Sequence, residues 1–208
     1  MQRAMTDEAK DQRRQALLSA ALNEFFEKGF AATRMDDVAK RAKLSKGTVY
    51  LYFESKEAMF IALLESLAEP KIEMFESVME QVESFEVAIR TLFEIVPVII
   101  RTTEMPRFLK VLIGDSQMFP DIVALYRDAF IERALKLIAG LLTRAHNAGE
   151  ICVEAPELTA RIVVAPVVLS GIWHVVFRQD EASDVDLEAL FRIHGDMLIR
   201  SLKAEGAK

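Results

Sequence analysis

The spacing of apolar residues along the chain predicts α-helices almost throughout. Apolar side chains recur at steps of three and four residues, which places them on one face of a helix, and no segment shows the alternation of a strand. A first helix is expected at about residues 9–28, and Gly29 directly after it is typical of a helix C-terminus. Its inner face consists of Leu17, Leu18, Ala21, Leu22, Phe25 and Phe26. The pattern indicates an all-α fold.

Two short helices with a tight turn between them are predicted over residues 33–53. Thr33 and Asp36 match a capping box, in which a hydroxyl and a carboxylate satisfy free amides at a helix start. Ser45 is placed to cap the second short helix and Ser55 to cap a third, longer helix. The inward-facing residues are Met35, Val38, Ala39, Ala42, Leu44, Val49 and Phe53. Together with the first helix, this is the pattern of a helix-turn-helix domain.

The rest of the chain is expected to be a second helical region. Pro70 should kink or break the long helix that begins at Ser55, because proline removes a backbone hydrogen bond. Ser183 and Asp186 match another capping box at the start of the last helix. The other helices are expected at about 84–103, 105–116, 120–148, 156–178 and 183–204. We therefore divide the chain into a three-helix domain at 1–54 and a helical domain at 55–208.

The exposed side chains of the helix-turn-helix have the chemistry of a surface that binds double-stranded DNA. Lys46 and Lys56 can neutralise phosphates, and Thr48 and Tyr50 can reach base edges or thymine methyl groups. Gly47 leaves room for close approach of the second short helix to the major groove. Each of these could singly be an ordinary surface residue, but the spacing of the whole set favours DNA contact. The expected contacts are Thr33, Arg34, Lys46, Gly47, Thr48, Tyr50, Tyr52 and Lys56.

Charge is distributed in the way this interpretation requires. The net charge of the 208 residues is −6, which by itself argues against a nucleic-acid partner. However, residues 1–60 carry eleven Lys and Arg against nine Asp and Glu, whereas residues 61–208 carry a net charge of −8. Within 33–56 there are six basic and three acidic side chains. The positive field therefore lies where the motif lies.

Residues 10–60 resemble the DNA-binding domain of the TetR/AcrR family of bacterial transcriptional regulators. The resemblance rests on AALNEFFEKGF at 20–30, DDVAKRA at 36–42 and SKGTVYLYFESKE at 45–57. It implies DNA contacts from Thr33, Lys46, Thr48, Tyr50, Tyr52 and Lys56, and a C-terminal domain that binds an effector and forms dimers. In the turn, Lys43 stands where the family usually has glycine, and a positive φ there would cost about 1 kcal/mol. Arg34 replaces a common Thr or Ser and could add a phosphate contact.

The most apolar stretch of the chain predicts a homodimer rather than a membrane span. Ile162–Phe177 is apolar on all sides, yet its 16 residues fall short of the ~20 that a spanning helix needs. Such a helix should be buried by its own core on one side and by a second subunit on the other. A two-fold dimer would also suit a palindromic operator, whose half-sites lie roughly 34–36 Å apart. A monomer is the alternative. The expected interface residues are Val164, Val168, Ile172, Leu187, Leu190, Phe191, His194 and Leu198.

A binding pocket for a small apolar effector is expected among the helices between about 84 and 178. Pro97 and Pro166 lie within predicted helices, and the bends they cause leave space between neighbours. Each apolar residue around them could equally be plain core. Residues 108–126 also resemble the C-terminal domain of an AefR-like subgroup of the family. The candidate pocket residues are Phe93, Val96, Ile100, Phe108, Leu112, Tyr126, Phe130, Val168 and Trp173.

Nothing in the sequence indicates an enzyme, a cofactor or a metal site. It has no glycine-rich phosphate loop or nucleophile elbow, and its three histidines lie far apart. The single cysteine, Cys152, excludes an internal disulfide and suits a reducing cytoplasm; a redox sensor is the less favoured interpretation. Residues 1–16 are polar and charged, unlike a signal peptide.

The sequence therefore predicts a cytoplasmic, sequence-specific transcriptional regulator, and specifically a repressor that a small apolar effector releases. Two alternatives stay open. One is a constitutive DNA-binding protein without an effector. The other is a helical-bundle ligand carrier or enzyme with a vestigial helix-turn-helix.

Overall fold

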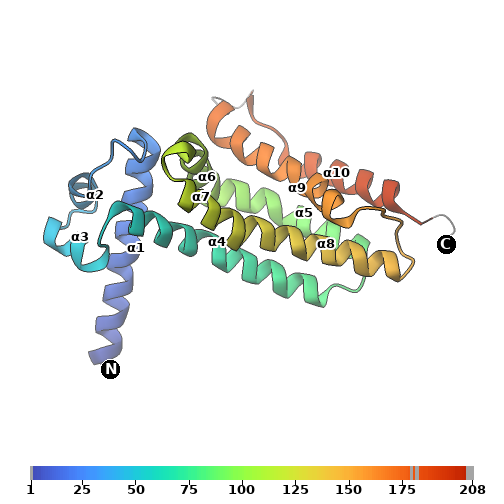
Figure 1. The fold of residues 1–208 in the computed structure, drawn as a ribbon, viewed down its shortest axis with the longest axis horizontal. Coiled ribbons are helices and arrows are strands. Elements are labelled where there is room, and N and C mark those ends of the chain that lie inside the picture. Colours follow the sequence, from blue (N-terminus) through green and yellow to red (C-terminus); the bar gives the residue numbers. More distant parts are fainter. Residues whose placement is uncertain (1, 179, 181–182, 205–208) are drawn as a thin grey trace. The chain divides into compact units, whose positions relative to one another are not determined.

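The computed structural model describes residues 2–178, 180 and 183–204, and their regular elements are helices (Figure 1). The prediction of an all-α fold is confirmed. The helices are α1 (Gln2–Lys28), α2 (Met35–Arg41), α3 (Lys46–Tyr52), α4 (Lys56–Gln81), α5 (Phe85–Thr102), α6 (Met105–Gly114), α7 (Pro120–Tyr126), α8 (Glu132–Asn147), α9 (Pro156–Ile172) and α10 (Leu187–Leu202). A 3-10 turn at Ser116–Met118 precedes α7, and π-helical segments at Arg127–Ile131 and Trp173–Phe177 follow α7 and α9.

The chain forms two compact units by packing. The N-terminal unit comprises Met1–Leu67 and Arg107–Ala124, and the C-terminal unit comprises Ala68–Pro106 and Leu125–Lys208. Helix α4 contributes to both units, and most of α6 belongs to the N-terminal unit although it lies far along the sequence. The units do not coincide with the predicted boundary at residue 54. The reason is that Met1–Leu67 and Arg107–Ala124, which lie far apart in the sequence, pack together.

A cluster of phenylalanine rings forms the core of the N-terminal unit. The ring centroids of Phe30 and Phe60 are 5.4 Å apart, and Phe30 lies 4.8 Å from Phe25. Phe108 of α6 lies 4.8 Å from Phe60, and Phe119 lies 4.2 Å from Phe30. Rings at these separations make favourable tilted or edge-to-face contacts. This explains why residues 107–124 belong with the helix-turn-helix.

Helices α5, α8, α9 and α10 enclose the core of the C-terminal unit. Phe93 of α5 stacks on Phe191 of α10 with ring centroids 5.5 Å apart. The two helices approach closely at Gly195, where an added Cβ would lie 3.1 Å from Phe93 Cδ2. The remaining buried side chains are mostly aliphatic and come from both chain segments of the unit.

Two of the predicted capping boxes are wrong, whereas two serine caps are confirmed. Ser45 Oγ accepts a hydrogen bond from the Thr48 amide at 3.1 Å, and Ser55 caps α4 in the same way. Thr33, however, does not cap α2, and Ser183 does not cap α10. The N-cap of α2 is instead Arg34, and that of α10 is Asp186.

The observed caps of α2 and α10 both use aspartate. Asp37 Oδ2 accepts the amide of Arg34, the N-cap of α2, at 3.0 Å. Asp186 is the N-cap of α10, and its Oδ1 accepts the Ala189 amide at 2.9 Å.

Proline does not break the helices in which it occurs. Helix α4 continues through Pro70, contrary to the predicted break, although its carbonyl ladder must lose one hydrogen bond there. Pro97 and Pro166 likewise lie inside α5 and α9.

Candidate nucleic-acid interface

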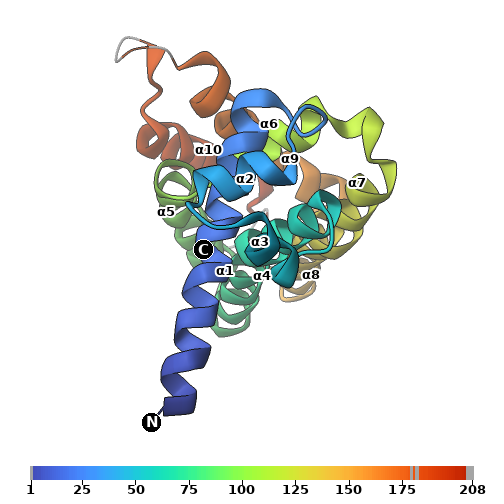
Figure 2. The same cartoon turned by 90° about the vertical axis from the view of Figure 1, so that its left-hand side faces the viewer.

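Helices α2 and α3 form a helix-turn-helix that packs beside α1 (Figure 2). Val38 and Ala39 of α2 are buried, as are Val49 of α3 and Phe53 directly after it. The Leu44 amide donates to the Ala39 carbonyl at 3.0 Å, which closes the turn onto α2. Buried side chains thus fix α3 by one side and leave its other side to the solvent.

Lys43 adopts the left-handed conformation that the sequence predicts for this turn. Its φ is +56°, a value that favours glycine and strains a residue with a Cβ. The Lys43 amide donates to the Lys40 carbonyl at 3.1 Å, so the turn is closed despite the strain.

The outer side of α3 carries most of the predicted DNA contacts. Tyr50 is 46% exposed, and Lys46 is exposed with its Nζ 2.8 Å from Asp36 Oδ1. Thr48 and Tyr52 are half-buried, and the Thr48 hydroxyl lies 2.8 Å from Ser45 Oγ. At Gly47 an added Cβ would meet only Ser45 Oγ, at 3.9 Å. These five residues lie within two helical turns and present a hydroxyl-rich surface with one ammonium group, which is paired with Asp36.

Two other predicted contacts are engaged inside the protein. Thr33 is 1% exposed, and its hydroxyl donates to the Gly29 carbonyl at 2.8 Å, so its side chain does not present itself to DNA. Lys56 Nζ donates to the carbonyls of Phe30, Ala31 and Thr33 at 2.9, 3.1 and 3.3 Å. These bonds hold together the loop between α1 and α2. A phosphate contact from Lys56 stays a prediction.

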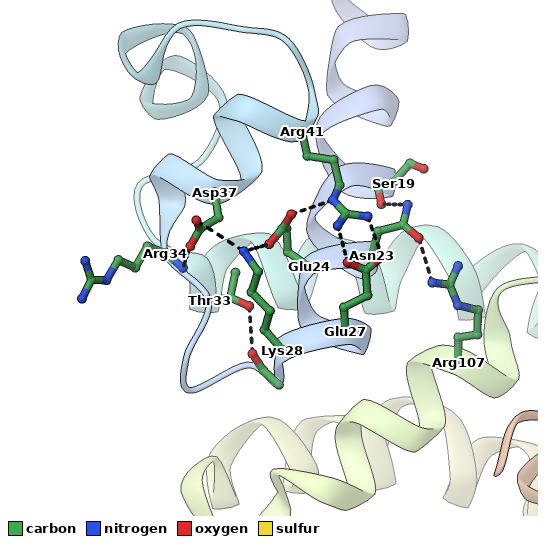
Figure 3. A network of polar contacts seen from close by, with 11 residues as sticks. Ser19, Asn23, Glu24, Glu27, Lys28, Thr33, Arg34, Asp37, Arg41 and Arg107 are labelled. Carbon is green, nitrogen blue, oxygen red and sulfur yellow. Dashed lines mark hydrogen bonds and ion pairs between the residues drawn. The ribbon is translucent and has the colours of Figure 1, made fainter.

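A polar network fixes α2 against α1, and sequence analysis missed it (Figure 3). Glu24 on α1 forms ion pairs with Lys28 Nζ and Arg41 Nε, each at 2.6 Å. Arg41 also pairs with Glu27. Lys28 Nζ lies 3.4 Å from Asp37 of α2. The available signal was the placement of Glu24, Glu27 and Lys28 on one side of α1 at steps of three and four. The Arg34 side chain, also drawn, points away from this network, and its contact with a phosphate stays a prediction.

The network lowers the pKa values of its carboxylates. Burial raises the pKa of Glu24, but the hydrogen bonds from Lys28 and Arg41 outweigh it and leave this pKa lowered. The Arg41 hydrogen bond lowers the pKa of Glu27, and the Arg34 amide lowers that of Asp37. All three groups are therefore carboxylates at neutral pH, and their charges pair with the basic side chains of Lys28 and Arg41.

Segment 107–124 joins the same unit through further polar contacts. Arg107 Nη2 donates to Asn23 Oδ1 at 2.7 Å, and its guanidinium lies 4.4 Å from the centre of the Phe26 ring. Asp115 Oδ2 accepts the Phe30 amide at 2.9 Å. The loop after α1 is thus held both by Lys56 and by a carboxylate from a distant segment.

The candidate pocket residues are divided between the two units. Phe93, Val96 and Ile100 are buried in the core of the C-terminal unit, whereas Phe108 and Leu112 belong to the N-terminal unit. The remaining four residues lie in the C-terminal unit.

In that group, Phe130 is buried, and its ring centroid lies 5.8 Å from that of Tyr126. Tyr126 is half-buried, and this burial raises the pKa of its hydroxyl group. Val168 and Trp173 are exposed, and Trp173 Nε1 donates to the Ser183 carbonyl at 3.0 Å. A surface hollow of about 360 Å³ lies elsewhere in this unit, lined by Asp128, Arg133, Lys136 and Leu137.

The predicted interface face of α10 is wrong. Leu187, Phe191 and Leu198 are buried against α5 within the same chain, and Leu190 is packed against that core. His194 is half-buried beside Phe93, and its Nε2 lies 3.3 Å from the Val163 carbonyl. The exposed apolar face of α10 instead carries Ile193 and Met197. The three- and four-residue spacing correctly predicted a helix here. It does not show which of the two apolar faces of α10 packs into the core of its own chain.

Helix α9 exposes several large apolar side chains. The exposed ones are Leu158, Ile162, Val168 and Leu169. The predicted interface residues on α9 are exposed or half-buried; they are Val164, Val168 and Ile172. We call Leu158, Ile162, Leu169, Ile193 and Met197 the apolar ridge.

With the π-helical segment, the helix spans Pro156–Phe177, 22 residues, and is long and apolar enough to cross a membrane by length and composition alone. The predicted helix at about 156–178 has these bounds, and the 16 residues counted above are only its most apolar part.

Among the residues the structure covers, no group of three His, Cys, Asp or Glu side chains is placed to hold a metal. Cys152 is a free thiol and is exposed, and its amide donates to the Leu202 carbonyl at 2.7 Å.

Comparison with known proteins agrees with this geometry. Residues 17–63 match the model for bacterial regulatory proteins of the tetR family, and residues 88–191 match the C-terminal domain of AefR-like transcriptional repressors. The HTH-type transcriptional regulator YfiR of Bacillus subtilis (strain 168) is 45% identical over 62 residues, and this covers 30% of either chain. YdeS, another HTH-type transcriptional regulator of that organism, is 26% identical over 178 residues, 81% of either chain.

A solved structure shows the same fold. The transcriptional regulator FadR from Bacillus subtilis, in complex with stearoyl-CoA, superimposes with a TM-score of 0.65 at 19% identity. The match covers 90% of this chain and 98% of that one.

The helix-turn-helix and the helical fold around it define a DNA-binding transcriptional regulator. The chain belongs to the TetR family of bacterial transcriptional regulators, as its sequence predicted. Within that family, its C-terminal region is of the AefR-like repressor kind.

Proposed function

We propose that this protein is a homodimeric, cytoplasmic repressor that places one α3 helix in each half-site of a palindromic operator. The observation that carries the proposal is the solvent-facing side of α3. There Lys46 and Tyr50 are exposed while Val49 anchors the helix from within. A helix fixed by one side and polar on the other is suited to the major groove.

The residues have separable tasks in this proposal. Lys46 and Arg34 neutralise backbone phosphates, and this binding weakens as salt rises. Thr48, Tyr50 and Tyr52 contribute hydroxyl groups that can donate to bases or to phosphates. Gly47 allows the backbone of α3 to approach the duplex. Thr33 and Lys56 act by holding the loop before α2, and so they position the site.

We further propose that the apolar ridge is the dimer interface. Its five residues are exposed, apolar and confined to α9 and α10. A second copy that brings the same ridge would bury both surfaces, as a two-fold interface does. This explains why α9 is apolar on its outer side without requiring a membrane.

We propose that the effector is a small apolar molecule bound in the C-terminal unit. FadR, which shares the fold, is in complex with stearoyl-CoA, a ligand with a long apolar chain. Phe93, Val96, Ile100, Tyr126 and Phe130 supply apolar surface in this unit. Helix α4 runs through both units and would carry the response to the helix-turn-helix. A coupling of about 1–3 kcal/mol would change operator affinity by roughly 5–150-fold.

The DNA part of the proposal is tested by fluorescence anisotropy with a duplex from the region flanking the protein's own gene and a scrambled duplex. Binding should be selective and should weaken markedly between two salt concentrations. Lys46→Ala and Tyr50→Ala should each reduce operator affinity. Lys136→Ala, which removes an exposed lysine on α8, is the matched control and should not. Equal affinity of all four proteins for both duplexes would refute the proposal.

The effector part is tested separately, by thermal unfolding with a panel of fatty acids and acyl-CoA thioesters. A ligand that raises the unfolding temperature should also weaken operator binding. No stabilisation by any apolar ligand would favour a constitutive DNA-binding protein. Stabilisation without salt-sensitive DNA binding would favour a ligand carrier or an enzyme.

A further inference from the structure

Leu51 is the most exposed of the large apolar side chains in the part of the chain that the structure describes. It lies on α3 between two tyrosines and is 84% exposed. A single exposed leucine is ordinary on a protein surface, so exposure alone indicates nothing. What distinguishes Leu51 is its place on the helix that faces DNA.

The position of Leu51 follows from helix geometry. Each residue of an α-helix advances by about 100°, so Leu51 lies roughly 200° around α3 from the buried anchor Val49. Gly47 and Thr48, four and three residues earlier, share its face. Gly47 has no side chain and only Ser45 Oγ close to the position of a Cβ, so Leu51 is the exposed large apolar side chain of this face.

The chemistry of the leucine side chain restricts what it can contact in the major groove. It has neither a donor nor an acceptor, so it can bind neither a phosphate nor the polar edge of a base. The one apolar group that the bases present in this groove is the C5 methyl of thymine. A protein partner is not supported, because one leucine is far smaller than the ~800 Å² per partner of a stable interface.

We propose that Leu51 reads sequence by contacting the C5 methyl group of a thymine in each operator half-site. The proposal depends on DNA binding by the helix-turn-helix and not on an effector response. Leu51 is absent from the contacts expected from sequence, because a leucine on a short helix is indistinguishable there from a core residue. Its exposure is what assigns it to the DNA-facing surface.

The test begins with the full-length protein and a pool of random duplexes, from which the preferred site is selected. Each thymine of that site is then replaced in turn by deoxyuridine, which lacks only the C5 methyl, and affinity is measured by fluorescence anisotropy. One thymine in each half-site should be sensitive. Removing its methyl group should weaken binding by about fourfold per half-site, the equivalent of roughly 0.8 kcal/mol for one buried carbon.

Variants at Leu51 assign the effect to this side chain. Leu51→Ala should bind the thymine and deoxyuridine duplexes equally, whereas Leu51→Met, which retains an apolar tip, should still prefer thymine. Ile113→Ala removes an exposed apolar side chain from α6 of the same unit and should leave the preference unchanged. Because position 51 is exposed and alanine favours helices, thermal stability should not fall.

Three outcomes would overturn the proposal. The wild-type protein could be insensitive to every deoxyuridine, so that no methyl group is read. Leu51→Ala could retain the full penalty, which would assign the methyl contact to another residue, such as Thr48 or Tyr50. The selection could yield no preferred sequence, which would also remove sequence-specific binding itself.

Discussion

At the scale of single residues, charge and position are poor guides to which side chains of the helix-turn-helix are free to act. Lys56 is basic and lies beside α3 in the sequence, yet its ammonium group donates to three backbone carbonyls and lies 4.6 Å from the centre of the Phe30 ring. Lys46 is also basic, and its single partner, Asp36, is itself exposed. An exposed ion pair contributes little free energy and can be exchanged for a phosphate.

Backbone strain at Lys43 gives the first prediction at this scale. Lys43→Gly should increase the free energy of unfolding by up to about 1 kcal/mol, because glycine adopts a φ of +56° without strain. Urea denaturation followed by circular dichroism measures the change. Lys43→Ala is the control, since it removes the same charge and keeps the Cβ, and it should not stabilise the protein. A gain from alanine equal to that from glycine would show that the charge and not the strain is responsible.

At the scale of helices, two glycines within helices have opposite surroundings. An added Cβ at Gly195 of α10 would lie 3.1 Å from Phe93, whose ring is held between Phe191 and His194. At Gly140 of α8 the nearest atom is the end of the flexible Arg144 side chain, at 3.7 Å.

Gly195→Ala should therefore reduce the free energy of unfolding by about 1–3 kcal/mol, because overpacking exceeds the gain in helix propensity. Gly140→Ala should instead increase it, by up to about 1 kcal/mol. Thermal and urea unfolding of the two variants measure both effects. Similar changes in the two variants would mean that α5 and α10 are less tightly packed at Gly195 than the structure shows.

The network between α1 and α2 predicts a pH dependence of stability. Glu24, Glu27 and Asp37 have lowered pKa values in the folded protein, so the unfolded chain binds more protons as the pH falls below about 4.5. The stability they contribute is fully present above their unfolded pKa values and is lost as pH falls through the folded values.

The urea midpoint should therefore decline steadily below pH 4.5 in the wild-type protein. In Arg41→Gln, the midpoint at pH 7 should be lower and the decline below pH 4.5 shallower, because the hydrogen bonds that lower the Glu24 and Glu27 pKa values are lost. Arg90→Gln, which removes an arginine that pairs with Glu86 and Asp196 elsewhere, controls for loss of positive charge. An unchanged decline in Arg41→Gln would exclude the network as its source.

At the scale of the whole molecule, assembly should depend on the apolar ridge. Ile162→Glu and Leu169→Glu together should convert a dimer into a folded monomer, because the ridge would then bury two charges in each subunit. Analytical ultracentrifugation measures the mass, and anisotropy should show weaker operator binding, since two half-sites are no longer bound together. Met118→Glu, at another exposed apolar position, should stay dimeric. A double variant that remains dimeric would place the interface elsewhere.

Local patterns determined the secondary structure and the motif. The three- and four-residue period gave the helices, and Ser45, Ser55, Gly29 and the turn at Lys43 gave most boundaries around the helix-turn-helix. These features depend on interactions between residues a few positions apart, so the sequence alone carries them. Caps were misplaced at Thr33 and Ser183, because the N-caps of α2 and α10 are Arg34 and Asp186.

Contacts between distant segments were decided by the tertiary structure. Periodicity showed that α10 has an apolar face, but not that Phe191 packs on Phe93 while Ile193 and Met197 remain outside. It could not show that α6 joins the helix-turn-helix through Phe108 and Phe60 either. The physical reason is the same in each case. Helix formation is a local property of the chain, whereas the choice of which apolar face is buried depends on the complete set of surfaces that compete for it.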